Sequence, residues 1–263
     1  MRFTLPGLAF LLCACSGSGG EAPIETVLRV KTTAHLPFGD DDPVRMKGKP
    51  PRALPVHGID LSRHNKAVDF RRAKRAGIGF AFIKATEGRD DRDRNFQRYS
   101  RAASRAGMPW GGYHFYYFCA PAAAQARNFI EAVPKGGGKL PPVLDVEWNP
   151  KSPTCRKRPA PKVVVRQLKA FLNAVERHYG QKPIIYTTVD FHRENLANGE
   201  LPGYQYWLRS VTAEPKFKYP GRPWTFWQYT GTGRVPGIEG PVDINAYRGS
   251  RAEWRAWLAK NRK

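Results

Sequence analysis

Short apolar runs alternate with longer amphipathic stretches from Val56 to the end of the chain. Most of these runs are bounded by glycine, proline or polar residues, as β-strands are. The pattern predicts eight strands, over Val56–Leu61, Phe80–Ala85, Gly111–Phe118, Pro142–Trp148, Pro183–Thr188, Tyr204–Val211, Trp224–Tyr229 and Val242–Ala246.

The amphipathic stretches predict helices, each ending near glycine or proline, over Val68–Ala76, Arg94–Ala106, Ala120–Ala132 and Lys162–Tyr179. Such alternation is expected of β-α units around a mainly parallel sheet or barrel. The last three strands follow one another too closely for full helices between them. We therefore expect an α/β barrel with helices in its first five units, loops between its last three strands and an amphipathic tail, Arg251–Leu258. A three-layer open sheet is the alternative.

The first 55 residues lack this pattern. Residues 1–15 run from Met1-Arg2 through an apolar stretch to Cys13-Ala14-Cys15, the layout of a bacterial export signal and too short to span a bilayer. Leu12–Cys15 also resembles a lipobox, in which Cys15 carries a lipid anchor; a cleaved signal and soluble secretion is the alternative. Residues 16–55, rich in Gly, Pro and charge, predict a flexible tether, with the barrel domain at 56–263. The protein is thus expected to be exported, as a periplasmic or outer-membrane lipoprotein or in secreted form.

Charge adds a class of partners. The chain carries 44 Lys and Arg against 22 Asp and Glu, a formal net charge of +22. Such a charge predicts attraction to polyanions, including anionic envelope polymers. The basic residues are spread along the chain and include no RNA-binding aromatic motif, which argues against a specific nucleic-acid partner.

Candidate chemistry lies where the predicted strands end, because barrel enzymes place catalytic side chains at the carboxyl ends of their strands. Asp60 ends the first strand, Asp145 and Glu147 end the fourth, and Asp243 opens the last. Strand side chains alternate, so Asp145 and Glu147 share one face while Leu144 and Val146 pack on the other.

Two close carboxylates raise at least one pKa, which lets a carboxylic acid stay protonated near neutral pH and protonate a leaving group. Residues two apart on a strand lie about 6.6 Å apart at Cα, between the carboxyl separations of retaining and inverting glycosidases. A solvated surface charge or helix cap is the alternative for any single acid. The six histidines show no metal-binding spacing and no cofactor fingerprint is present, so we expect neither a metal nor a cofactor.

Six segments, in order over about residues 56–260, resemble glycoside hydrolase family 25, the Chalaropsis-type lysozymes. They are Gly58–Ser62, Phe82–Gly88, Gly112–Phe115, Pro142–Glu147, Trp227–Tyr229 and Val242–Asn245. The resemblance implies a flattened, TIM-like (β/α)5(β)3 barrel that hydrolyses the β-1,4 bond after N-acetylmuramic acid in peptidoglycan, and we expect it to act as a monomer. Two segments depart from the family pattern, Arg89–Arg92 and Trp207-Leu208-Arg209, which affects the shape of the cleft.

By the same resemblance, Glu147 is the general acid/base, Asp145 lies next to the reacting sugar, and Asp60 and Asp243 flank the site. Retention assisted by the substrate's own acetamide is the implied mechanism. Tyr113 would line the site near that acetamide.

Two cysteines lie beyond the signal, Cys119 and Cys155. Independently of the resemblance, an even pair of cysteines in an oxidising compartment is expected to bond. They would follow the third and fourth strands, neighbours in a barrel, so we expect a disulfide between them.

Other side chains have two interpretations each. Strand-end aromatics could contact sugar or fill the core, and Lys84 with Glu87 is at least as consistent with a structural ion pair as with catalysis. His114 is expected to be a core histidine. A wall-binding lipoprotein without turnover and a hydrolase of chitin-like polymers are the alternative functions. The residues predicted to contact substrate beside Tyr113 are Trp148, Tyr186, Trp207, Trp227 and Gln228.

Overall fold

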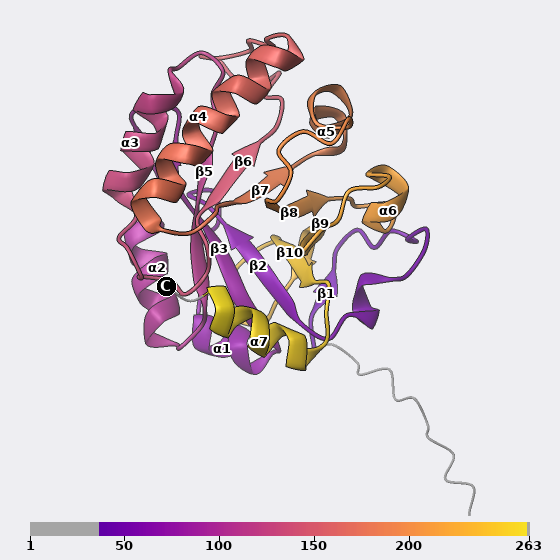
Figure 1. The fold of residues 1–263 in the computed structure, drawn as a ribbon. Helices are drawn as coiled ribbons and strands as arrows, with labels where there is room; N and C mark the ends of the chain where they lie inside the picture. Colours follow the sequence, from indigo (N-terminus) through magenta and orange to yellow (C-terminus); the bar gives the residue numbers. More distant parts are fainter. Residues whose placement is uncertain (1–36, 262–263) are drawn as a thin grey trace, which may run out of the picture. The chain divides into compact units, whose positions relative to one another are not determined.

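Eight strands close into a barrel in the computed structural model, which describes residues 37–261 (Figure 1). Seven are parallel and β10 alone runs antiparallel to its two neighbours, while pairing of β8 with β9 completes the ring. The predicted barrel is confirmed, and the open sheet is excluded by the β8–β9 pairing. The barrel strands are β2 (His57–Leu61), β3 (Ile78–Glu87), β5 (Trp110–Phe115), β6 (Val143–Val146), β7 (Ile184–Thr187), β8 (Gln205–Arg209), β9 (Phe226–Arg234) and β10 (Val242–Tyr247).

Helices follow each of the first five barrel strands. They are α1 (Phe70–Arg75), α2 (Phe96–Arg105), α3 (Ala122–Ala132), α4 (Pro161–Tyr179) and α5 (Val189–Asn195). The prediction of five helical units followed by three strands is confirmed. Only the four-residue α6 (Pro215–Lys218) lies between β8 and β9. The ends of α4 follow from local chemistry, because Pro161 starts it and Gly180 ends it at a φ of 64°.

The core has two layers. The inner one fills the barrel with large side chains, including Phe82, which stacks on Trp207 at a ring-centroid distance of 4.4 Å. The outer one lies between the strands and their helices. Gly58 shows how tightly the interior is filled, since a Cβ there would lie 2.3 Å from the Phe80 ring.

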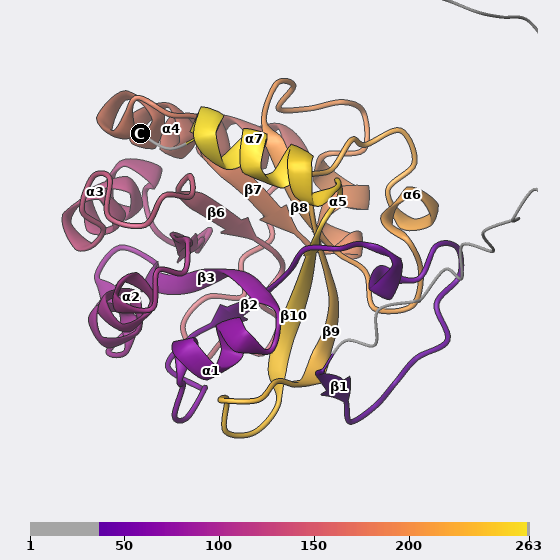
Figure 2. The ribbon, with the colours of Figure 1, turned by 90° about the horizontal axis from the view of Figure 1, so that it is seen from below.

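Helix α7 (Arg251–Asn261) lies across the end of the barrel where the parallel strands begin (Figure 2). Its Trp254 packs against Phe80 and Phe226, with ring-centroid distances of 5.2 and 6.2 Å. The tail predicted from its amphipathic pattern therefore closes this end, and the carboxyl ends of the strands form the other.

The folded part begins earlier than the predicted start at Val56. Phe38 and Leu54 are buried, and β1 (Gly39–Asp40) pairs with the far end of β9. The 3₁₀ helix η1 (Pro51–Ala53) follows. The predicted tether is therefore too long, because two buried apolar side chains and a strand pairing hold its second half on the barrel. The predicted signal and Cys15 lie outside the described residues.

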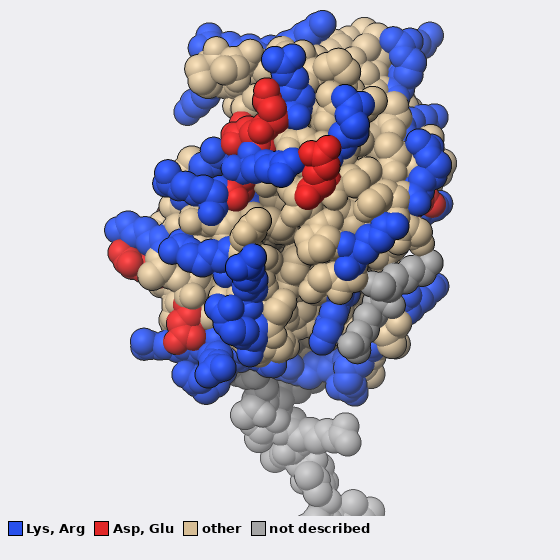
Figure 3. All heavy atoms as spheres, turned by 90° about the vertical axis from the view of Figure 1, so that its left-hand side faces the viewer, with Lys and Arg blue, Asp and Glu red and all other residues tan. Residues whose placement is uncertain are grey.

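One face of the molecule is strongly basic (Figure 3). The helices on this side, α2, α3 and α4, together carry far more Lys and Arg than Asp and Glu. All of these Lys and Arg side chains are exposed. These basic residues are Arg98, Arg101, Arg105, Arg127, Lys162, Arg166, Lys169 and Arg177.

Among residues 37–261, no helix combines the length and apolar character needed to cross a bilayer.

Cys119 and Cys155 form a disulfide, as predicted, with Cα atoms 5.7 Å apart. It joins the loops that follow β5 and β6 and spans 36 residues of chain. A cross-link across that much chain restricts the unfolded ensemble more than the native state.

Replacing both cysteines with serine should lower the free energy of unfolding by about 3–4 kcal/mol, the loop-entropy value for a loop of this size. Urea unfolding of the protein with its disulfide formed measures this. Reductant should lower the wild-type midpoint to that of the variant and leave the variant unchanged. Equal midpoints for wild type and variant without reductant would contradict the prediction.

Candidate active site

Four carboxyl groups meet at the open end of the barrel. Asp60 is near the end of β2, Asp145 is on β6, Glu147 follows directly after β6, and Asp243 is the second residue of β10. Asp60 and Asp243 are cross-strand partners in the antiparallel β2–β10 pair. Besides burial, the charge of Asp60 raises the pKa of each of the other three acids. The structure therefore brings together all four predicted acids.

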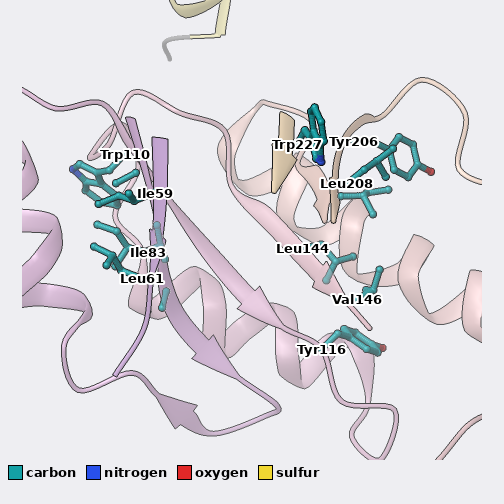
Figure 4. Packing of buried hydrophobic residues seen from close by; sticks show 14 of the residues in the cluster. Ile59, Leu61, Ile83, Trp110, Tyr116, Leu144, Val146, Tyr206, Leu208 and Trp227 are labelled. Carbon is teal, nitrogen blue, oxygen red and sulfur yellow. The ribbon is translucent and has the colours of Figure 1, made fainter. Parts of the chain in front are cut away.

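Alternation along β6 explains how Asp145 and Glu147 come to share one pocket. Leu144 and Val146 project from one side of β6 into the outer core layer (Figure 4). Val143, on the opposite face, belongs to the inner layer. Asp145 and Glu147 continue that inner face toward the open end, as the sequence pattern predicts.

A hydrogen-bond network holds Asp60. Its Oδ2 accepts hydrogen bonds from Gln228 Nε2 and Asn245 Nδ2, both at 2.9 Å. The amides are themselves fixed: Tyr186 donates its hydroxyl proton to Gln228 Oε1 at 2.8 Å, and Trp207 Nε1 donates to Asn245 Oδ1 at 2.7 Å. Two buried residues thus orient the donors that face one carboxylate.

The pKa values of the acids rise to different extents. Burial raises the pKa of Asp60 to about 6, although the Asn245 and Gln228 donors and Arg209 oppose the rise. Burial, followed by the negative charge of Asp60, raises the pKa of Asp243 to about 8. Hydrogen-bond donors favour the ionised form, so Asp60 is the acid best prepared to carry a charge.

Asp145 and Glu147 titrate as a pair. Burial raises the pKa of Glu147 to about 7, while Arg209 and Lys84 pull it down. Burial and then the charge of Glu147 raise the pKa of Asp145. In the described part of the chain, Asp145 Oδ1 is buried without a hydrogen-bond partner. Near neutral pH the pair can hold a proton and release it, which is what acid/base catalysis requires.

Arg209 is a site residue that sequence reasoning did not assign. It ends β8, and its positive charge lowers the pKa of Asp60, Glu147 and Asp243. It forms no ion pair within residues 37–261. Its position two residues beyond the inward-facing Trp207 could have revealed it, as the step from Asp243 to Asn245 could have revealed Asn245.

The predicted sugar-contacting side chains separate into two groups. Tyr113, Tyr186, Trp207 and Gln228 lie inside the barrel, and all four are buried. Trp227 lies in the outer core layer, where Nε1 donates to the Ser210 carbonyl oxygen.

Trp148 is also away from the inner face. It packs against Phe191 at a centroid distance of 4.7 Å, donates to Glu194 and lies under Arg158. Alternation explains the positions of Trp148 and Trp227, because each neighbours an inward-facing residue, Glu147 and Gln228. Core packing is therefore the role that the structure indicates for Trp207 and Trp227.

Lys84 and Glu87 form the predicted ion pair. Glu87 also accepts a hydrogen bond from Tyr117 and faces Arg63. The Arg89–Arg92 segment turns back so that β4 (Asp91–Arg92) pairs with the end of β3. His114 is fully buried between Thr86 and Gln125, and burial lowers its pKa to about 4, which confirms a core histidine.

A closed barrel with paired carboxylates at the carboxyl ends of its strands is the arrangement of a glycoside hydrolase. The family model "Glycosyl hydrolases family 25" matches residues 59–238, and the chain belongs to this family. It is therefore a glycoside hydrolase enzyme, as the resemblance implied.

Curated relatives and solved structures agree with this assignment. Lysozyme M1 of Streptomyces globisporus is 33% identical over 78% of this chain and 72% of its own length. The uncharacterized protein YegX of Escherichia coli K12 is 34% identical over 87% of this chain and 83% of its own. A family 25 glycosyl hydrolase from Bacillus anthracis matches with a TM-score of 0.69 at 31% identity, covering 81% of this chain and 97% of that one.

Replacing Asp243 with asparagine should stabilise the protein increasingly as pH rises from about 4 to 8. An unfolded aspartate ionises near pH 4, whereas the folded Asp243 keeps its proton until about pH 8. The stability that its protonated form contributes is complete below pH 4 and is lost as pH rises through this window. Asparagine does not titrate, so the gap between the variant and wild type should widen by up to about 1.4 kcal/mol for each pH unit between these limits.

Urea unfolding at pH 4, 6 and 8 measures this difference. Asp90→Asn, at an exposed carboxyl paired with Arg89, controls for losing one negative charge from a basic protein. A gap between Asp243→Asn and wild type that stays constant with pH would contradict the prediction.

Proposed function

We propose that the enzyme is a lysozyme that hydrolyses the β-1,4 bond between N-acetylmuramic acid and N-acetylglucosamine in peptidoglycan. The observation that carries the proposal is the Asp145–Glu147 pair, in which burial raises the pKa of Glu147 to about 7 beside a second buried carboxyl. Relatives named lysozyme and N,O-diacetylmuramidase, in Streptomyces and in Chalaropsis, support peptidoglycan as the substrate.

In this mechanism Glu147 donates its proton to the oxygen of the leaving sugar as the glycosidic bond breaks. The carbonyl oxygen of the substrate's own acetamide attacks the sugar carbon from which the leaving oxygen departs. It bonds on the opposite face of that carbon and forms a cyclic intermediate. Glu147, now a carboxylate, removes a proton from water, which opens that intermediate. Two inversions give net retention.

Asp145 is suited to assist the acetamide. The acetamide N–H becomes more acidic as its carbonyl oxygen attacks, and a buried carboxylate oxygen is a good acceptor for it. With the proton of the pair on Glu147, Asp145 is ionised and its Oδ1 is such an acceptor, since it is buried and has no hydrogen-bond partner within residues 37–261. Asp60 and Asp243 flank the reacting sugar, and Tyr113, whose pKa is raised by burial and then by Asp60 and Asp145, would lie near the acetamide.

The positive charge would hold the enzyme on anionic polymers of the cell envelope. The basic faces of α2, α3 and α4 offer an exposed surface for such contacts (Figure 3). An exported monomer fits this role, either anchored through a lipid on Cys15 in the periplasm or outer membrane or released after signal cleavage.

Glu147→Gln should lower the rate at which reducing ends are released from purified peptidoglycan by a factor of at least about 100, because the amide cannot donate or accept the proton. Turnover is measured by reducing-end assay and by mass spectrometry of the products. Circular dichroism and the urea midpoint should show a folded protein. Unchanged turnover by the variant would remove Glu147 from the mechanism. If wild type released reducing ends from chitin and not from peptidoglycan, the substrate would be reassigned.

Asp145→Asn should lower kcat far more than it raises KM, because its contact with the acetamide strengthens only as the bond breaks. The sugar should not become attached to Asp145 during turnover. Intact-protein mass spectrometry of enzyme trapped with a slow substrate checks this. A covalent sugar mapped to Asp145 would replace acetamide assistance with direct nucleophilic attack.

A further inference from the structure

Residues 38–52, here called the N-terminal strap, form a feature that the catalytic site does not explain. The strap starts at β1, which pairs Gly39 and Asp40 with Arg234 and Gly233 of β9. It then reaches the loop after β8, where the backbone of Lys47 forms an isolated β-bridge with Ala213. These residues precede the segment matched by the family model, which starts at residue 59.

Between the strap and strands β8, β9 and β10 lies a groove of about 550 Å³. Its strap side includes Val44, 46% exposed, which is one of two large apolar side chains exposed to this degree among residues 37–261. Its barrel side includes the buried Tyr229 and Ile244. The groove therefore has apolar walls on both sides, and one wall is open to solvent.

The groove adjoins the catalytic carboxyl groups. Arg209 lines it, and the charge of the same residue acts on Asp60, Glu147 and Asp243. Gly231 also lines it, and a Cβ on Gly231 would lie 3.2 Å from Asp243 Oδ1. Arg209 and Gly231 therefore border both the groove and the group of acids.

The groove contains arginines that form no ion pair within residues 37–261. Arg45, Arg52 and Arg209 line it, and none of them forms an ion pair within the described part of the chain. One of the two strap carboxylates that line the groove is already engaged, because Asp40 Oδ1 accepts a hydrogen bond from Thr232 Oγ1 at 2.6 Å.

Asp42 also lines the groove and is exposed, so the lining carries both signs of charge with an excess of positive charge. Unpaired guanidinium groups between apolar walls suit carboxylates on an extended chain, since arginine binds carboxylates in a fork geometry.

We propose that the strap groove binds the acidic peptide stem that the N-acetylmuramic acid residue of peptidoglycan carries. This inference rests on the proposed function and names the part of the substrate that the barrel carboxylates do not contact. The lactyl group of the reacting sugar would enter beside Arg209, and the carboxylates of the stem would meet Arg45 and Arg52. The apolar walls would contact its small side chains.

The test compares two polymers with the same glycan strand, one with its stems and one from which an amidase has removed them. Wild type should have a kcat/KM about tenfold higher on the stem-bearing polymer, the effect of losing about one charge-assisted contact. For Arg45→Gln/Arg52→Gln this preference should fall to nearly none. These two arginines are chosen because amidase treatment leaves a lactyl carboxylate that Arg209 could still bind.

Arg71→Gln/Arg255→Gln is the matched control. Both residues are exposed and outside the groove, and the double variant loses the same charge as the strap variant. It should keep the wild-type preference. An equal loss in both double variants would mean that general attraction to an anionic polymer causes the preference, which would overturn the proposal.

Calorimetric binding of a soluble disaccharide-tetrapeptide and of the bare disaccharide separates this proposal from the proposed function. The tetrapeptide form should bind wild type about tenfold more tightly, and the strap variant should lose this difference. Turnover of peptidoglycan with equal binding of both ligands overturns the groove alone. Tighter binding of the peptide form without turnover overturns the proposed function alone.

Discussion

Crowding of four acidic side chains in one barrel mouth, two of them buried and two half-buried, is the constraint on which the site depends. Like charges close together in a poorly solvated place cannot all ionise, so protons must remain on some of them at neutral pH. The surroundings decide which ones. Two amide donors favour the charge on Asp60, whereas Asp243 lies beside that charge and holds its proton to about pH 8. Lys84 and Arg209 keep the Asp145–Glu147 pair from becoming fully neutral.

The inner core layer supports this arrangement from below. Tyr186 and Trp207 are buried aromatics whose polar atoms orient the Gln228 and Asn245 side chains. Two of the aromatic residues predicted to bind sugar thus position the amides that hydrogen-bond to Asp60. Their buried polar atoms are satisfied, so the network costs little in desolvation and holds the carboxylate in one orientation.

The strands and the carboxylates could be predicted from the sequence because both show in short local runs. A strand buried on both faces is a nearly continuous apolar run, in which acidic residues such as Asp145 and Glu147 stand out. The pattern predicts no helix over α5 (Val189–Asn195) itself, so the fifth helix is expected only from the architecture. The site roles of Arg209 and Asn245 were not predicted. Each lies two residues from an inward-facing side chain, but which side of a strand faces inward is known only once strands distant in sequence close the barrel.

The N-terminal strap escaped for a different reason. Its pairing partner, the end of β9, lies more than 190 residues away, as the Thr232–Asp40 separation of 192 shows. Nothing in its own composition distinguishes it from a solvated linker, since its few large apolar residues, Phe38, Val44 and Met46, lie among charged residues, glycine and proline. Contacts of this kind depend on the closed barrel and have no local signature.

The antiparallel pairing of β10 with β2 has a consequence for how such an enzyme can change. Asp60 and Asp243 face each other through the backbone hydrogen bonds of a sheet, so their separation is independent of the connecting segments at the open end. Those segments can lengthen, shorten or be exchanged while the acid set keeps its spacing. Substrate range can therefore diversify at the rim without the chemistry having to be rebuilt.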